Sequence, residues 1–119
     1  MHTDIISPKT HGIFDYAVAG SLLVLPSLLG FSKKIKTIYA IEAMMVLGYT
    51  ALTDMPGGVR PIIPFKTHGV IDRLNIAQFA IQTSFKPFRK DKKAMIFNIA
   101  FTLIAATVVT FTNWKGEED

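Results

Sequence analysis

Cysteine is absent from this chain of 119 residues, and charged side chains are scarce. Without cysteine the protein can form no disulfide and can hold no metal through thiolates. Aspartate, glutamate, lysine and arginine make up 18% of the residues, below the roughly 25% that is usual for a soluble domain. A glycine-rich phosphate loop, a paired-histidine zinc motif and a nucleophile triad are also missing from the sequence. We therefore expect no enzymatic activity.

Basic residues outnumber acidic ones, giving a formal net charge of +4 and a pI near 9.5. They cluster in short segments between apolar stretches, which is typical of membrane proteins rather than of nucleic-acid-binding ones. The first residues lack the basic start and the cleavage site of a secretory signal. We expect the lipid bilayer as partner, together with a second copy or another membrane protein, and no nucleic acid.

Four apolar segments predict four membrane-crossing helices, at about residues 10–31, 35–53, 67–85 and 94–114. The last has no formal charge over its 21 residues, which as a helix would span roughly 30 Å, the thickness of a bilayer core. The third carries a polar stripe that should face the interior of a bundle: Asp72, Asn75, Gln78 and Gln82. Segments rich in lysine, proline and glycine separate the four.

The sequence contains an internal repeat. The heptapeptide Lys-Thr-His-Gly-Ile-Phe-Asp at residues 9–15 returns 57 positions later, at 66–72, as Lys-Thr-His-Gly-Val-Ile-Asp. Without a gap, the same offset pairs Phe31 with Phe88 and Thr53 with Thr110. We predict an all-α fold with one membrane domain, residues 1–119. It is a four-helix transmembrane bundle of two tandemly duplicated helical hairpins, at about 7–56 and 64–113. A soluble four-helix bundle or a peripheral membrane protein is the rival interpretation.

The distribution of lysine and arginine predicts the orientation. The loops inside the two hairpins carry most of them: Lys33, Lys34, Lys36, Lys86, Arg89, Lys90, Lys92 and Lys93. The opposite side carries fewer: Lys9, Arg60, Lys66 and Lys115. The positive-inside rule then places the hairpin loops in the cytoplasm and both termini outside it.

The repeated motif contains the candidate functional residues, a histidine and an aspartate in each copy. Positions four apart share a helix face, so His11 lies next to Asp15 and His68 next to Asp72. Two imidazoles with two carboxylates suit zinc, iron or manganese, and would equally suit a proton relay. A haem held between the two histidines is a further option.

Two more charged residues are expected at the same end of the bundle. Asp54 follows the second segment, and Arg73 follows Asp72 directly. Arg73 has no charged counterpart in the first half, and a nearby cation opposes a symmetric metal site.

A structural interpretation of the motif competes with the chemical one, and the sequence favours it. Thr10 and Thr67 would cap the helices, and Gly12 and Gly69 would let a neighbouring helix approach closely. The aspartates would lie near the positive helix N-termini.

Glu42 lies within the second apolar segment, where a carboxylate is costly. Tyr49 and Thr53 share its helix face, which suggests an inward polar line. The interpretation we favour from the sequence is that Glu42 extends toward Lys33 or Lys36.

Residues 7–16, 25–31, 53–56 and 63–69 together resemble a group of small bacterial inner-membrane proteins of the SPW-repeat type. This chain has Pro-Ser-Leu at 26–28 without the tryptophan of that pattern. The resemblance implies a multi-pass protein of the bacterial inner (cytoplasmic) membrane and supplies no catalytic residues. We expect a structural or accessory membrane protein without a cofactor. The alternative is a metal- or proton-binding membrane protein that uses the duplicated motif, with a divalent metal as cofactor.

Overall fold

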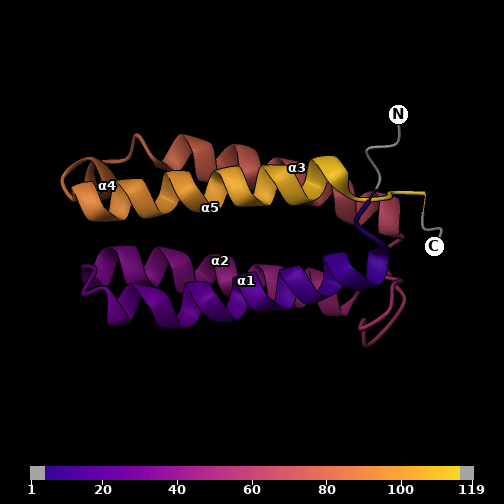
Figure 1. The fold of residues 1–119 in the computed structure, drawn as a ribbon. Helices are drawn as coiled ribbons and strands as arrows, with labels where there is room; N and C mark the ends of the chain where they lie inside the picture. Colours follow the sequence, from indigo (N-terminus) through magenta and orange to yellow (C-terminus); the bar gives the residue numbers. More distant parts are fainter. Residues whose placement is uncertain (1–4, 116–119) are drawn as a thin grey trace.

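The computed structural model describes residues 5–115, and these residues are mainly helical (Figure 1). The helices are α1 (Pro8–Leu28), α2 (Lys33–Ala51), α3 (Phe65–Gln82), α4 (Lys86–Arg89) and α5 (Lys92–Phe111). Between residues 5 and 115 there is no β-strand, only two isolated bridges. The four predicted segments are present as the long helices. The short α4 was not predicted, and it occupies a stretch where we expected only a break.

The helices begin about two residues earlier than predicted because other residues cap them. The Ser7 side chain accepts a hydrogen bond from the Thr10 backbone at 3.3 Å and caps α1, with Pro8 at its first position. Ser32 caps α2 in the same way, whereas α3 starts after Pro64 without a side-chain cap. The predicted caps Thr10 and Thr67 were wrong, since both lie inside helices.

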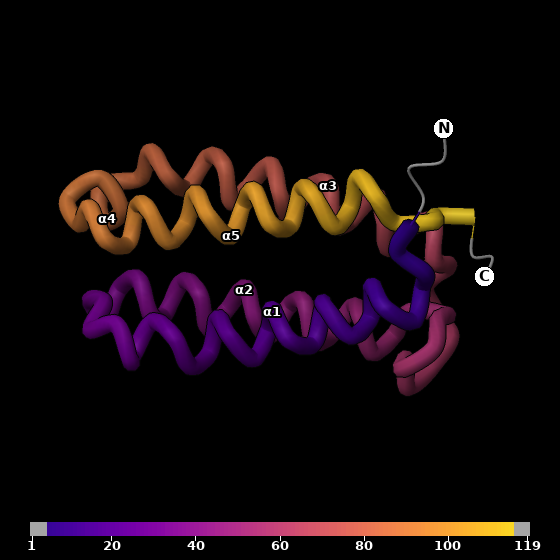
Figure 2. Tube along the Cα trace, in the orientation of Figure 1, coloured from indigo at the N-terminus to yellow at the C-terminus, as the bar shows by residue number. Residues whose placement is uncertain are grey.

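The long helices form two hairpins that lie side by side (Figures 1 and 2). Helix α1 packs on α2 and α3 packs on α5, with the turns of both hairpins at one end of the molecule. Gly30, with φ of +72°, makes the tight turn of the first hairpin, and α4 lies in the longer turn of the second. Residues near the two chain ends meet at the opposite end of the molecule.

The two halves match with a shift that the gapless alignment missed. Helices α1 and α3 begin 57 positions apart, but α2 and α5 begin 59 apart because the loop containing α4 is longer. The partner of Thr53 is therefore Thr112 and not Thr110. Both threonines form an isolated bridge just after a helix, Thr53 with Ile63 and Thr112 with Ile6. These bridges hold each threonine against the start of the other hairpin.

The buried apolar core lies toward the hairpin turns. Tyr39 is fully buried there, with Phe79, Phe88 and Phe97 around its ring at centroid distances of 5.5–6.2 Å. Polar side chains are buried as well, and many large apolar side chains lie on the surface instead. Helices α1 and α5 are long and apolar enough to cross a membrane.

Candidate metal centre

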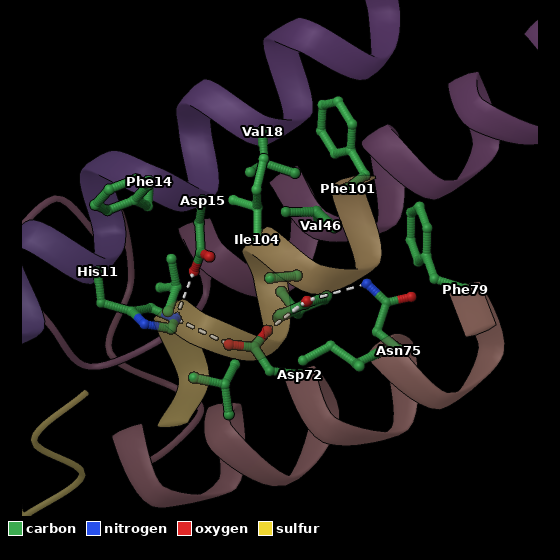
Figure 3. A pocket seen from close by; sticks show the side chains of 15 residues that line it. His11, Phe14, Asp15, Val18, Val46, Asp72, Asn75, Phe79, Phe101 and Ile104 are labelled. Atoms are coloured by element: carbon green, nitrogen blue, oxygen red, sulfur yellow. Dashed lines mark hydrogen bonds and ion pairs between the residues drawn. The ribbon is translucent and has the colours of Figure 1, made fainter. Parts of the chain in front are cut away.

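The repeated histidines and aspartates converge at the end of the bundle opposite the hairpin turns. His11 Nε2 lies 2.8 Å from Asp72 Oδ2, and His68 Nε2 lies 2.8 Å from Asp15 Oδ2. The contacts within each heptapeptide are longer, 3.2 Å for His11–Asp15 and 3.4 Å for His68–Asp72. The strongest pairs therefore join one hairpin to the other. Figure 3 shows His11 with both carboxylates in front of it.

Two threonines fix where the protons of the histidine rings lie. Thr112 Oγ1 donates to the Val108 carbonyl at 2.5 Å, and Thr53 Oγ1 donates to the Tyr49 carbonyl at 2.5 Å. A hydroxyl has one proton, so each threonine must accept from the imidazole Nδ1, at 2.8 Å in both cases. Both Nδ1 atoms thus carry a proton. If a ring is neutral, its Nε2 then has a lone pair directed at the carboxylates.

Counting protons defines the charge of the cluster. Two Nε2 and two carboxylate oxygens alternate around a small ring, and two of the contacts are 2.8 Å long. A nitrogen lone pair cannot lie this close to a carboxylate oxygen without a proton between them. One proton in each short contact gives the four side chains a net charge of zero. All four side chains are at most 13% exposed, and a neutral cluster is what such burial requires.

Neighbouring side chains orient the carboxylates and cover the cluster. Tyr49 donates its hydroxyl proton to Asp72 Oδ1 at 2.7 Å, and Thr50 donates to Asp15 Oδ2 at 3.4 Å. Trp114 lies against His11 and Phe65, with ring centroids 4.9 and 4.8 Å apart. These residues complete a shell around the ring of nitrogens and oxygens.

The two glycines of the motif, Gly12 and Gly69, let other parts of the chain pack closely against them. These parts are a tryptophan side chain and a loop, not a neighbouring helix as predicted. A Cβ on Gly69 would lie 2.9 Å from Trp114 Cε3, and one on Gly12 would lie 3.2 Å from the Pro56 carbonyl oxygen. The predicted close approach is confirmed, and the neighbours are Trp114 and the loop after α2.

We predict that Gly69→Ala displaces Trp114 and lowers the free energy of unfolding by about 1–3 kcal/mol through overpacking. Trp114 is the one tryptophan in the sequence, so a red shift of its fluorescence would report the displacement. Gly48→Ala is the matched control, since nothing lies within 4 Å of its added Cβ. It should stabilise α2 by about 0.5–1 kcal/mol. Equal behaviour of the two variants would contradict tight packing at Gly69.

Three predicted site residues lie outside this cluster. Asp54 is exposed, and its backbone N–H donates to the Ile63 carbonyl. Arg73 is exposed and lies over the Trp114 ring, 5.5 Å from its centroid, so it contacts the cover rather than the centre. Glu42 is only 3% exposed and accepts from Gln78 and Gln82. The prediction that Glu42 extends toward lysines was wrong, because its side chain points inward to these amides.

A small cavity adjoins the cluster between the two hairpins (Figure 3). Its volume is about 50 Å³, enough for water, and its walls come from α1, α2, α3 and α5. His11, Asp15 and Asp72 line one part, Tyr49 and Asn75 follow, and the rest is apolar.

The four side chains could hold a small metal ion. One nitrogen or carboxylate oxygen from each of His11, Asp15, His68 and Asp72 lies within 4.8 Å of the others. Tetrahedral zinc with ligands at about 2.0–2.1 Å needs ligand atoms about 3.3 Å apart, and the four histidine–aspartate contacts are 2.8–3.4 Å long. A porphyrin between the histidines would have to occupy the space that the carboxylates fill.

The sequence did not single out Thr112, Trp114 or Phe65, and it placed Tyr49 and Thr53 only on an inward face. Thr112 would have been found from a two-residue gap in the repeat. No family model, curated protein or solved structure matches the chain.

Proposed function

We propose that this chain is a small multi-pass membrane protein whose two tandem hairpins bind one divalent transition-metal ion between them. The ligands are His11 Nε2, His68 Nε2, and one carboxylate oxygen each from Asp15 and Asp72. The observation that carries the proposal is the pair of threonines, which commit both Nδ1 protons and leave both Nε2 atoms to the centre.

Membrane insertion is supported by the distribution of polar and apolar side chains. The described interior holds His11, Glu42, His68, Gln82 and Asn98, all at most 3% exposed. The exposed helix faces carry large apolar residues instead: Ile13, Phe14, Leu23, Val24, Ile41, Met44, Met45, Val70, Leu74, Ile81, Ile96, Ile99, Leu103 and Ile104. Such a surface would be costly in water and suits lipid.

Charge placement supports four crossings with the hairpin turns in the cytoplasm. Eight lysines and arginines lie at the turn end, and the paired residues Ile6 and Thr112 lie at the other. The location that goes with this is a bacterial inner membrane, with the metal centre near its outer face.

After alkaline carbonate extraction the protein should stay with the membrane fraction. Release into the soluble fraction would contradict insertion.

Charge balance supports a divalent ion. The metal-free cluster is neutral with two shared protons, and exchanging them for one M²⁺ keeps the buried cluster neutral. Each ligating histidine also donates its other ring N–H to a threonine oxygen, as metal-bound histidines in proteins usually do to a neighbouring acceptor. Two nitrogen and two oxygen ligands suit zinc, manganese or iron(II).

The metal proposal is tested by zinc titration of the purified protein in detergent. Wild type should bind one ion per chain, and Asp72→Asn should weaken binding at least about 100-fold because a ligand carboxylate is lost. Asp54→Asn removes an exposed carboxylate at the same end of the bundle and should leave binding unchanged. If all three proteins bind zinc equally or not at all, the cluster joins the hairpins and holds no metal. The protein would then be a structural or accessory membrane component.

A further inference from the structure

A second polar cluster lies deeper in the bundle, nearer the hairpin turns. Its members come from α2, α3 and α5 and are linked by hydrogen bonds: Tyr39, Glu42, Gln78, Gln82 and Asn98. None of its described contacts reaches the four proposed metal ligands, so it is a separate site.

Asn98 sets the orientation of this cluster. Its Nδ2 donates to the Phe79 carbonyl at 2.8 Å and to Thr83 Oγ1 at 2.7 Å. Its Oδ1 accepts from the Tyr39 hydroxyl and from Gln82 Nε2, both at 2.8 Å. The carbonyl of Phe79 can only accept, so the Asn98 amide cannot be turned round, and Gln82 must present its Nε2 to Asn98.

This orientation leaves one acceptor without a donor. Gln82 is fully buried, and its Oε1 has no hydrogen-bond partner among residues 5–115. An unpaired buried polar atom of this kind costs about 1–3 kcal/mol. The Gln82 amide also touches Glu42, because its Nε2 donates to Glu42 Oε1 at 3.3 Å.

Gln82 Oε1 lacks a donor, and the buried Glu42 carboxyl beside it lacks a cation. Gln78 Nε2 donates to Glu42 Oε2 at 3.0 Å from α3. Tyr39 is the other titratable member of the cluster, and its hydroxyl proton goes to Asn98. In the described part of the chain no lysine, arginine or histidine forms an ion pair with Glu42. An isolated carboxylate in such a place is strongly disfavoured.

We propose that Glu42 is a proton-binding site in the interior of the bundle and holds a proton at neutral pH. One proton removes the uncompensated charge and supplies the donor that Gln82 Oε1 lacks. The acid O–H then donates to Gln82 Oε1 while the Glu42 carbonyl oxygen accepts from Gln82 Nε2, a two-bond acid–amide pair. A metal cation fits poorly, because both Glu42 oxygens already accept amide N–H groups and Gln82 Oε1 alone cannot supply the oxygen ligands that such an ion needs.

The cavity beside the metal centre extends toward this acid, but Glu42 and its hydrogen-bond partners are not among the residues that line it. Asp72 lines its outer part, and Val46 and Phe79 line it near the deep cluster. Val46 is one helical turn from Glu42, and Phe79 follows Gln78.

Carbon-13 NMR of protein labelled at the glutamate side-chain carboxyl tests the proposal. The chain has three glutamates, and the other two, Glu117 and Glu118, lie outside the described residues. At neutral pH one signal should have the chemical shift of a protonated carboxyl, and Glu42→Gln should remove it. Three ionised carboxyls at neutral pH would overturn the proposal.

Two further experiments assign the protonated carboxyl signal to Glu42 even if the Glu42→Gln variant does not fold. Glu117→Gln and Glu118→Gln should each remove one ionised signal and leave the protonated one in place. Added Na⁺ should not shift the protonated signal, and a shift that saturates with Na⁺ would assign the site to a cation instead. Neither experiment depends on metal at His11 and His68.

Discussion

Replacing His11 or His68 with alanine is expected to lower the free energy of unfolding of the metal-free protein by about 3–5 kcal/mol. Each substitution leaves a buried aspartate without its short partner, Asp72 for His11 and Asp15 for His68. Breaking a buried charged pair on one side costs about this much, far more than losing an exposed pair. Denaturant unfolding in detergent micelles measures the change.

Because the cluster is symmetric, the two histidine variants can be compared with each other. The two histidines have equivalent partners, so both variants should lose similar stability and both should lose the metal. Asp54→Asn changes an exposed residue at the same end and should shift unfolding by no more than about 0.5 kcal/mol. A large loss in one histidine variant and none in the other would contradict the paired arrangement.

Zinc binding is expected to release about two protons per ion. The metal displaces the protons held between each Nε2 and its carboxylate, so lowering the pH must weaken binding. Where the free cluster holds both protons, the apparent affinity should change by about 100-fold per pH unit. Calorimetry in buffers that differ in protonation enthalpy gives the proton count directly.

Variants of the two threonines that bond to the histidine rings test whether the zinc binds at these histidines. Thr53→Val and Thr112→Val remove the acceptors of the Nδ1–H groups and should weaken zinc binding about 10–100-fold, because the histidine rings lose the bonds that orient them. Binding that is independent of pH and releases no proton would place the zinc elsewhere on the protein.

The helices and the site residues could be predicted largely from the sequence. Apolar segments located the four long helices, and the spacing of four placed each histidine beside an aspartate on one face. The four-atom cluster depends on these local features plus one tertiary fact, that the two hairpins lie side by side with their turns at the same end.

The remaining details depend on contacts between the hairpins, which local patterns do not contain. His11 bonds more closely to Asp72 than to Asp15, although Asp15 is its neighbour on the helix. Thr112 reaches His11 because the loop with α4 shifts α5 by two residues. Glu42 turns inward because Gln78 and Gln82 on another helix supply donors, a reason that the lysines of its own helix could not reveal.

X-ray absorption spectroscopy of the zinc-loaded protein shows directly whether His11 and His68 bind one ion together. We expect four nitrogen or oxygen ligands at about 2.0–2.1 Å, with the outer-shell scattering of two imidazoles. In His68→Ala the scattering of one imidazole should disappear. A spectrum of hydrated zinc, or one that is unchanged in His11→Ala and His68→Ala, would contradict a metal centre between the hairpins.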